Sequence, residues 1–138
     1  HLCGKGNLDE ECEKYSYSYK QLEFISEELP DLICEFFNVS DKREDTYIAG
    51  LSMGGYGALK IALKNPQRFG AAAGLSSVAD IVGTADMFKD VHIPIFGEDI
   101  IIPDSENLFE LAKIQNENPL KPRIYMEKGK RHENLDCI

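Results

Sequence analysis

The sequence predicts an α/β fold over residues 1–138, in which the strands of a parallel sheet are flanked by helices. Short apolar runs of strand length lie at 46–49, 69–75 and 123–126, and helical segments separate them. Strands that alternate with helices form parallel sheets joined by right-handed crossovers. At 43% hydrophobic and 28% charged residues, the composition is that of a globular domain, so we expect one packed domain.

The first helix is expected to begin at Ser18, because Gln21 follows at the spacing of a capping box. Its apolar residues recur at intervals of three and four: Leu22, Ile25, Leu29, Leu32, Ile33 and Phe36. Pro30 lies inside this helix, where a backbone hydrogen bond is lost and the proline ring clashes with the preceding turn. We therefore expect a kink or two abutting helices.

The next elements surround a glycine-rich turn. The first strand is expected at 46–49 and to end at Gly50. A helix is expected over 53–65, because Pro66 prevents its continuation. Apolar residues nearly encircle this helix, which indicates burial on most sides. A second buried strand is expected at 69–75.

The later part of the chain has weaker signals. Residues 80–104 show no clean period and are expected to form an insertion over a sheet edge. Ser105 is expected to begin another helix. The inward face expected for that helix comprises Leu108, Leu111, Ala112 and Gln115. The third strand, at 123–126, is expected to lead to Gly129.

One motif points to chemistry. Residues 50–54 read G-x-S-x-G between a predicted strand and a predicted helix, which is the context of a nucleophile elbow. Ser52 must then occupy a strained turn, and Gly50 and Gly54 would remove side chains that collide there. The new helix would direct its amide groups at an acyl oxyanion, with the Met53 N–H as the expected donor. The alternative is that Ser52 only caps the helix.

The stretch 47–80, Y-I-A-G-L-S-M-G-G-Y-G-A-L-K-I-A-L-K-N-P-Q-R-F-G-A-A-A-G-L-S-S-V-A-D, resembles the esterase D and S-formylglutathione hydrolase-like group of α/β-hydrolases. I-S-E-E-L-P at 25–30 and N-P-x-x-F at 65–69 are similar to its bacterial tributyrin esterase branch, and the match spans about 15–129. The resemblance implies a partial α/β-hydrolase fold. It also implies hydrolysis of short-chain carboxylic esters through an acyl-serine intermediate on Ser52, without a cofactor.

The sequence departs from the family pattern after Gly129. The family has a G-x-x-D acid there, whereas this chain has His132 at that position, and no later histidine follows. His132 and Asp136 are the remaining candidates for base and acid, although their order differs from the hydrolase order Ser, Asp, His. Asp80 is another candidate acid, with a turn-forming role as its alternative. Since the complete fold needs roughly 180 residues, we expect a central fragment of it.

The composition argues against several classes of binding partner. The 15 Lys and Arg against 24 Asp and Glu give a net charge of −9, which argues against nucleic acid as a partner. No apolar run reaches the roughly 18 residues of a membrane span. The four cysteines are widely spaced and show no ligand-like pairing with histidine, so we expect a cytoplasmic protein with reduced thiols and no metal site.

The expected partner is a small-molecule ester, and two other functions stay open. The missing acid and base favour a non-catalytic hydrolase remnant that binds a partner or ligand. An acyltransferase of the same fold would pass the acyl group to an acceptor other than water. The open edges of an incomplete sheet also lead us to expect a homo-oligomer.

Overall fold

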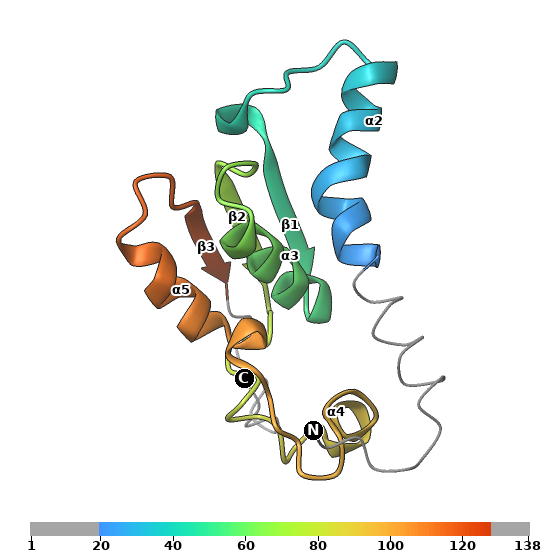
Figure 1. The fold of residues 1–138 in the computed structure, drawn as a ribbon, viewed down its shortest axis with the longest axis vertical. Helices are drawn as coiled ribbons and strands as arrows, with labels where there is room; N and C mark the ends of the chain where they lie inside the picture. The colour runs from blue at the N-terminus through green and yellow to red at the C-terminus, as the bar shows by residue number, and fades with distance from the viewer. Residues whose placement is uncertain (1–19, 128–138) are drawn as a thin grey trace, which may run out of the picture. The chain divides into compact units, whose positions relative to one another are not determined.

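A computed structural model describes residues 20–127 of the chain. Its contacts group the chain into two units, residues 1–39 and residues 40–138, and each is described separately. Helices and parallel strands alternate along the second unit, as the sequence predicts (Figure 1). The expectation of one domain over 1–138 stays a prediction.

In the first unit, a helix changes its hydrogen-bonding register. A π-helical segment, Phe24–Glu28, leads into the α-helix α2, Leu29–Phe36, and Pro30 lies in the first turn of α2. The Leu29 N–H donates to the carbonyl of Phe24, five residues earlier, which is a π-type bond. The irregularity expected at Pro30 therefore takes the form of a π-to-α change, beginning where proline has no N–H to donate.

The second unit contains a parallel three-stranded sheet in the order β1-β2-β3. Its strands are β1, Tyr47–Leu51; β2, Ala71–Leu75; and β3, Arg123–Glu127. Residues Ala49, Ala73 and Tyr125 lie side by side across the three strands. The sequence located all three strands, but β1 and β3 run beyond their expected ends and β2 begins later than expected.

Helix α3, Met53–Lys64, covers one face of this sheet. Leu59 is 1% exposed, and a Cβ added at Gly74 of β2 would lie 2.7 Å from its Cδ1 atom. The buried apolar residues are Ala58, Leu59, Ile61, Ala62, Leu63, Phe69, Ala72, Ile81, Leu108 and Leu111. Half of them come from α3, which confirms the predicted burial of that helix.

The opposite face of the sheet carries exposed side chains. A shallow hollow of about 330 Å³ is lined by residues 47–49, 71–73 and 123–125. Tyr47 and Tyr125 are 59% and 58% exposed on this face. The hollow lies along the first halves of the strands, away from the carboxyl end of β1 from which the G-x-S-x-G turn emerges, so it is not part of the candidate site.

The segment between β2 and α5 contains a helix that the sequence did not predict. Helix α4, Lys89–Phe96, includes Pro94, which obscured its pattern. Residues Asp104–Glu106 form a 3-10 turn and α5 spans Leu108–Asn116. The helix start expected at Ser105 is wrong, because Asn107 is the cap and its Oδ1 atom accepts from the Phe109 N–H at 3.0 Å.

The described part of the chain, residues 20–127, contains no helix with the length and apolar character needed to cross a bilayer. In the same range, no three or more His, Cys, Asp or Glu side chains gather where they could hold a metal ion.

Candidate active site

Ser52 lies in a strained turn between β1 and α3. Its φ of 54° and ψ of −120° belong to a region that residues with a side chain rarely adopt. The Ser52 N–H donates to the Leu75 carbonyl at 2.9 Å, which holds the turn to the end of β2. The Ser52 side chain is exposed and makes no capping hydrogen bond, although it occupies the N-cap position of α3. This is the geometry of a nucleophile elbow.

The two glycines of the motif are not equivalent. A Cβ added at Gly50 would lie 2.7 Å from the backbone nitrogen of Gly55 and closer still to the Gly54 carbonyl group. A Cβ added at Gly54 would meet no atom of residues 20–127 within 4 Å. The expected collision is therefore confirmed at Gly50 and wrong at Gly54. Gly55, just outside the motif, is the second crowded position, because its Cβ would lie 2.6 Å from the Ser77 Cβ atom.

Met53 is the first residue of α3. The first N–H groups of a helix have no carbonyl partner within the helix, and they carry the positive end of its dipole. The Ser52 carbonyl accepts from the N–H groups of Gly55 at 3.0 Å and Tyr56 at 3.2 Å, which anchors the turn to the first turn of α3. The Met53 N–H is thus one of the first N–H groups of α3.

Ser77 packs beneath this turn, and sequence reasoning missed it. It is 5% exposed, and its Oγ atom has no hydrogen-bond partner among the residues described. The residue before it, Ser76, has a φ of 46° and donates its N–H to the Glu127 carbonyl at 2.7 Å. The chain thus turns sharply after β2 and passes directly under Gly55.

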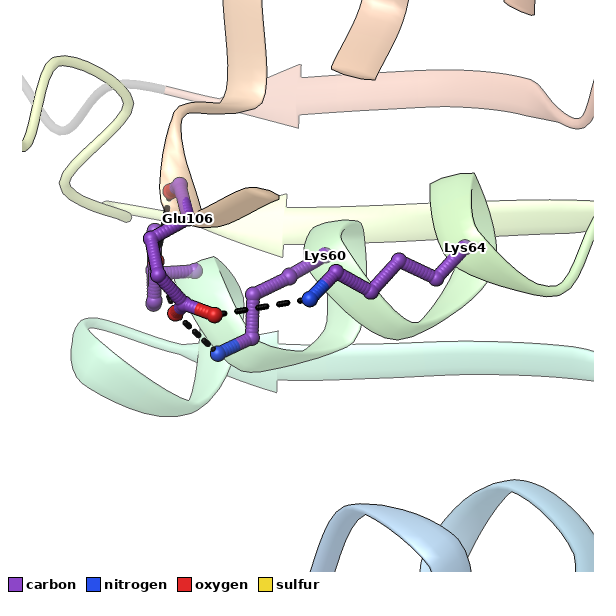
Figure 2. A network of polar contacts seen from close by, with 4 residues as sticks. Lys60, Lys64 and Glu106 are labelled. Carbon is purple, nitrogen blue, oxygen red and sulfur yellow. Dashed lines mark hydrogen bonds and ion pairs between the residues drawn. The ribbon is translucent and has the colours of Figure 1, made fainter. Parts of the chain in front are cut away.

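A polar network joins three successive turns of α3 to the residue before the cap of α5 (Figure 2). The Glu106 carboxylate accepts from the Lys60 Nζ atom at 2.6 Å and from the Lys64 Nζ atom at 3.4 Å. The Tyr56 hydroxyl donates to the Glu106 carbonyl at 2.7 Å. The Lys60 Nζ atom also lies 5.3 Å from the centre of the Tyr56 ring. Spacing of four between Tyr56, Lys60 and Lys64 was the sequence signal for a shared face.

Burial and charge shift two pKa values in this network. Burial alone would raise the pKa of Glu106, but the hydrogen bond and charge of Lys60, with a smaller effect of Lys64, hold that pKa below its ordinary value. Burial, and then the negative charge of Glu106, raise the pKa of the Tyr56 hydroxyl far above its ordinary value. Glu106 is therefore ionised and Tyr56 is neutral across the physiological range.

The other candidates from the sequence have different outcomes. His132 and Asp136 lie outside the described residues. Asp80 forms a turn, because its Oδ1 atom accepts from the Gly83 N–H at 2.7 Å. Apart from those candidates, the histidine of the described residues, His92, is 6% exposed in α4. The rings of Phe88 and Phe96 lie edge-on to it with centroids at 6.4 and 5.9 Å, and its Nδ1 atom has no hydrogen-bond partner among the described residues.

Comparison with known proteins agrees with this geometry. Residues 4–136 match the family described as "Putative esterase". An acetyl esterase of Caldicellulosiruptor saccharolyticus is 34% identical over 133 residues, which cover 88% of this chain and 48% of that protein. The chain thus spans about half the length of this curated relative.

Solved structures give the same result. The substrate-bound fluorophosphonate-binding serine hydrolase F of Staphylococcus aureus superposes with a TM-score of 0.60 at 28% identity, over 80% of this chain and 42% of that one. An S-formylglutathione hydrolase of Agrobacterium tumefaciens superposes with a TM-score of 0.62 at 28% identity, over 83% and 39% of the two chains. The described residues have a partial α/β-hydrolase fold, and the chain belongs to this esterase family.

Proposed function

We propose that this chain carries the nucleophile of a serine esterase that hydrolyses short-chain acyl esters. The observation that carries the proposal is the strained backbone of Ser52, with φ at 54°, between a parallel strand and the start of a helix. Strain of this kind persists only where the surrounding structure imposes it, and it raises the serine hydroxyl above the sheet.

In the proposed reaction, the Ser52 oxygen attacks the carbonyl carbon of the ester while its proton passes to a general base. The Met53 N–H donates to the oxyanion that develops on the former carbonyl oxygen. The base returns its proton to the departing alcohol, and an acyl-serine remains. Water then attacks the acyl-serine and releases the carboxylic acid, so that no cofactor is required.

For the base and the acid that orients it, the candidates within this chain are His132 and Asp136. The base must approach the Ser52 oxygen to within hydrogen-bonding distance, and the acid must approach the far nitrogen of the imidazole. Replacement of His132 by Gln would then reduce ester hydrolysis about as strongly as the loss of Ser52.

The relatives support the class of substrate. One is named for acetyl ester hydrolysis, another for its binding of fluorophosphonates, and a third for its action on S-formylglutathione. All three names involve attack on an acyl or acyl-like centre. We extend this chemistry to a small ester for this chain, in a cytoplasmic setting that the widely spaced cysteines favour.

The test is covalent labelling. The purified protein is treated with excess fluorophosphonate and its intact mass is measured, with Ser52→Ala and Ser105→Ala variants alongside. Ser105, which is exposed on the 3-10 turn, serves as the control serine. We expect one adduct in the wild type and in Ser105→Ala, and none in Ser52→Ala. Hydrolysis of p-nitrophenyl acetate should fall at least about 1000-fold in Ser52→Ala. An unlabelled wild-type protein would overturn the proposal.

A further inference from the structure

Glu106 closes a long excursion of the chain. The excursion, residues 76–107, leaves the sheet after β2 and returns at the cap of α5. Figure 1 shows its helix α4 beyond the carboxyl ends of the strands, the end from which the Ser52 turn emerges. At its far end, Glu106 contacts Tyr56, Lys60 and Lys64 on three successive turns of α3.

Removing one partner of the attachment should be costly because part of it is buried. Lys60 as a whole is 8% exposed, and a buried ammonium group is tolerated only when a carboxylate compensates it. The Glu106 side chain is 23% exposed and approaches Lys60 to 2.6 Å. The pair between Lys113 and Glu110 has the same length, but its side chains are 70% and 37% exposed. Such a surface pair contributes little to stability.

The attachment lies close to the proposed nucleophile. Tyr56 donates its backbone N–H to the Ser52 carbonyl at 3.2 Å and its hydroxyl to the Glu106 carbonyl at 2.7 Å. The other end of the excursion is held beneath the same turn, where Ser77 packs under Gly55. Both ends of residues 76–107 are therefore fixed to the Ser52 turn or to the helix that follows it.

Between these two ends, the excursion exposes many apolar side chains. They are Val82, Met87, Val91, Ile93, Ile95 and Ile101, each between 39% and 73% exposed. Side chains of this kind can contact the acyl chain of a substrate, provided that the backbone that carries them is held in place.

We propose that Glu106 is a positioning residue, which holds the excursion 76–107 against α3 and so fixes the apolar wall that the acyl group of the substrate contacts. This inference rests on the proposed esterase function. Glu106 does not touch the reacting atoms, so its loss should weaken substrate binding and leave the chemical step nearly intact.

The experiment compares the wild type with Glu106→Gln, and it uses Glu110→Gln, on α5, as the matched control. Hydrogen–deuterium exchange is followed for peptides within 77–107 and for peptides of β1 and β2. Steady-state kinetics are measured with p-nitrophenyl acetate and hexanoate, normalised to the number of sites that fluorophosphonate labels. Lys64→Gln serves as a milder variant, since it removes only the 3.4 Å contact and leaves the Lys60 pair intact.

In Glu106→Gln we expect exchange in 77–107 to accelerate about tenfold or more while the strands stay protected. KM for the hexanoate should rise about fivefold or more, with kcat within about twofold of the wild type. Lys64→Gln should show smaller changes in the same direction, and Glu110→Gln none. If Glu106→Gln does not fold, the Lys64→Gln result decides.

Three results would overturn the inference. One is unchanged exchange in 77–107 in both Glu106→Gln and Lys64→Gln. Another is faster exchange with KM unchanged, which would leave Glu106 a purely structural role. The third is a wild-type protein that fluorophosphonate does not label at Ser52. That result would remove the esterase function itself, and the exchange data would then show separately whether Glu106 anchors the excursion.

Discussion

Replacement of Gly50 and of Gly54 by alanine should change the unfolding free energy in opposite directions, although both positions are glycine in the G-x-S-x-G motif. At Gly50 the new methyl group would lie 2.7 Å from the Gly55 nitrogen and closer still to the Gly54 carbonyl. Ordinary van der Waals contact begins at 3.4 Å, so the strand and the helix start must separate by at least about 0.7 Å. The atoms in the way are backbone, which cannot rotate aside.

The magnitude follows from this displacement. Overpacking costs typically 1–3 kcal/mol, and we expect about 3 kcal/mol for Gly50→Ala because no side chain can yield. A shift of this size at the Ser52 turn should also slow labelling by fluorophosphonate about 100-fold. In Gly54→Ala the new methyl group meets no described atom within 4 Å, at the second position of α3. The unfolding free energy should therefore change by less than about 1 kcal/mol, and alanine's better helix propensity should increase it.

Urea denaturation of both variants and of the wild type gives the two unfolding free energies, and the rate of fluorophosphonate labelling reports the state of the turn. A Gly54→Ala protein as destabilised or as unreactive as Gly50→Ala would refute the reasoning. So would a Gly50→Ala protein with wild-type stability and reactivity, because the collision would then be absent.

Three further predictions concern the core, the polar network and the sheet edges. Because Leu59 is 1% exposed, Leu59→Ala should lower the unfolding free energy, measured by urea denaturation, by about 2–5 kcal/mol. Leu51 is 68% exposed, so Leu51→Ala should lower it by less than about 0.5 kcal/mol. The pKa of Glu106 is held below its ordinary 4.5, so the unfolded state binds more protons at acid pH. The stabilisation that Glu106 contributes is complete above pH 4.5 and is lost as the pH falls through the pKa of Glu106 in the folded state. The free energy of unfolding should therefore change less with acid pH in Glu106→Gln than in the wild type. The outer edges of β1 and β3 have no strand partner within residues 20–127, so sedimentation at rising concentration should show association, and a strictly monomeric species would contradict this.

The fold was predictable where the signals were local. Strands β1, β2 and β3 were recognised as short apolar runs, and α3 from its continuous apolar circumference and from Pro66. Helix α4 was missed because Pro94 interrupts its helical pattern. The start of α5 was misassigned because Ser105 and Asn107 are both good caps, and which one acts depends on the 3-10 turn before them.

In the candidate site too, the sequence predicted the local features and missed those that depend on tertiary packing. The strained turn at Ser52 was predicted from five residues, because strand, glycine, serine and helix start are adjacent in the chain. The catalytic roles of Ser52, Met53, His132 and Asp136 stay predictions for the labelling and mutational tests above. Ser77, buried under the turn, carried no sequence signal, since its position depends on how the end of β2 packs against α3.

The sequence by itself determined the succession of β1, α3, β2, α5 and β3 and the position of the sharp turn, because these follow from propensity, periodicity and the steric demands of neighbouring residues. Only the tertiary structure decided which glycines the turn requires, and it paired Glu106 with Lys60 across 46 residues of chain. Such contacts arise when packed elements bring distant segments together, and the burial that makes the loss of one partner costly exists only in the folded protein.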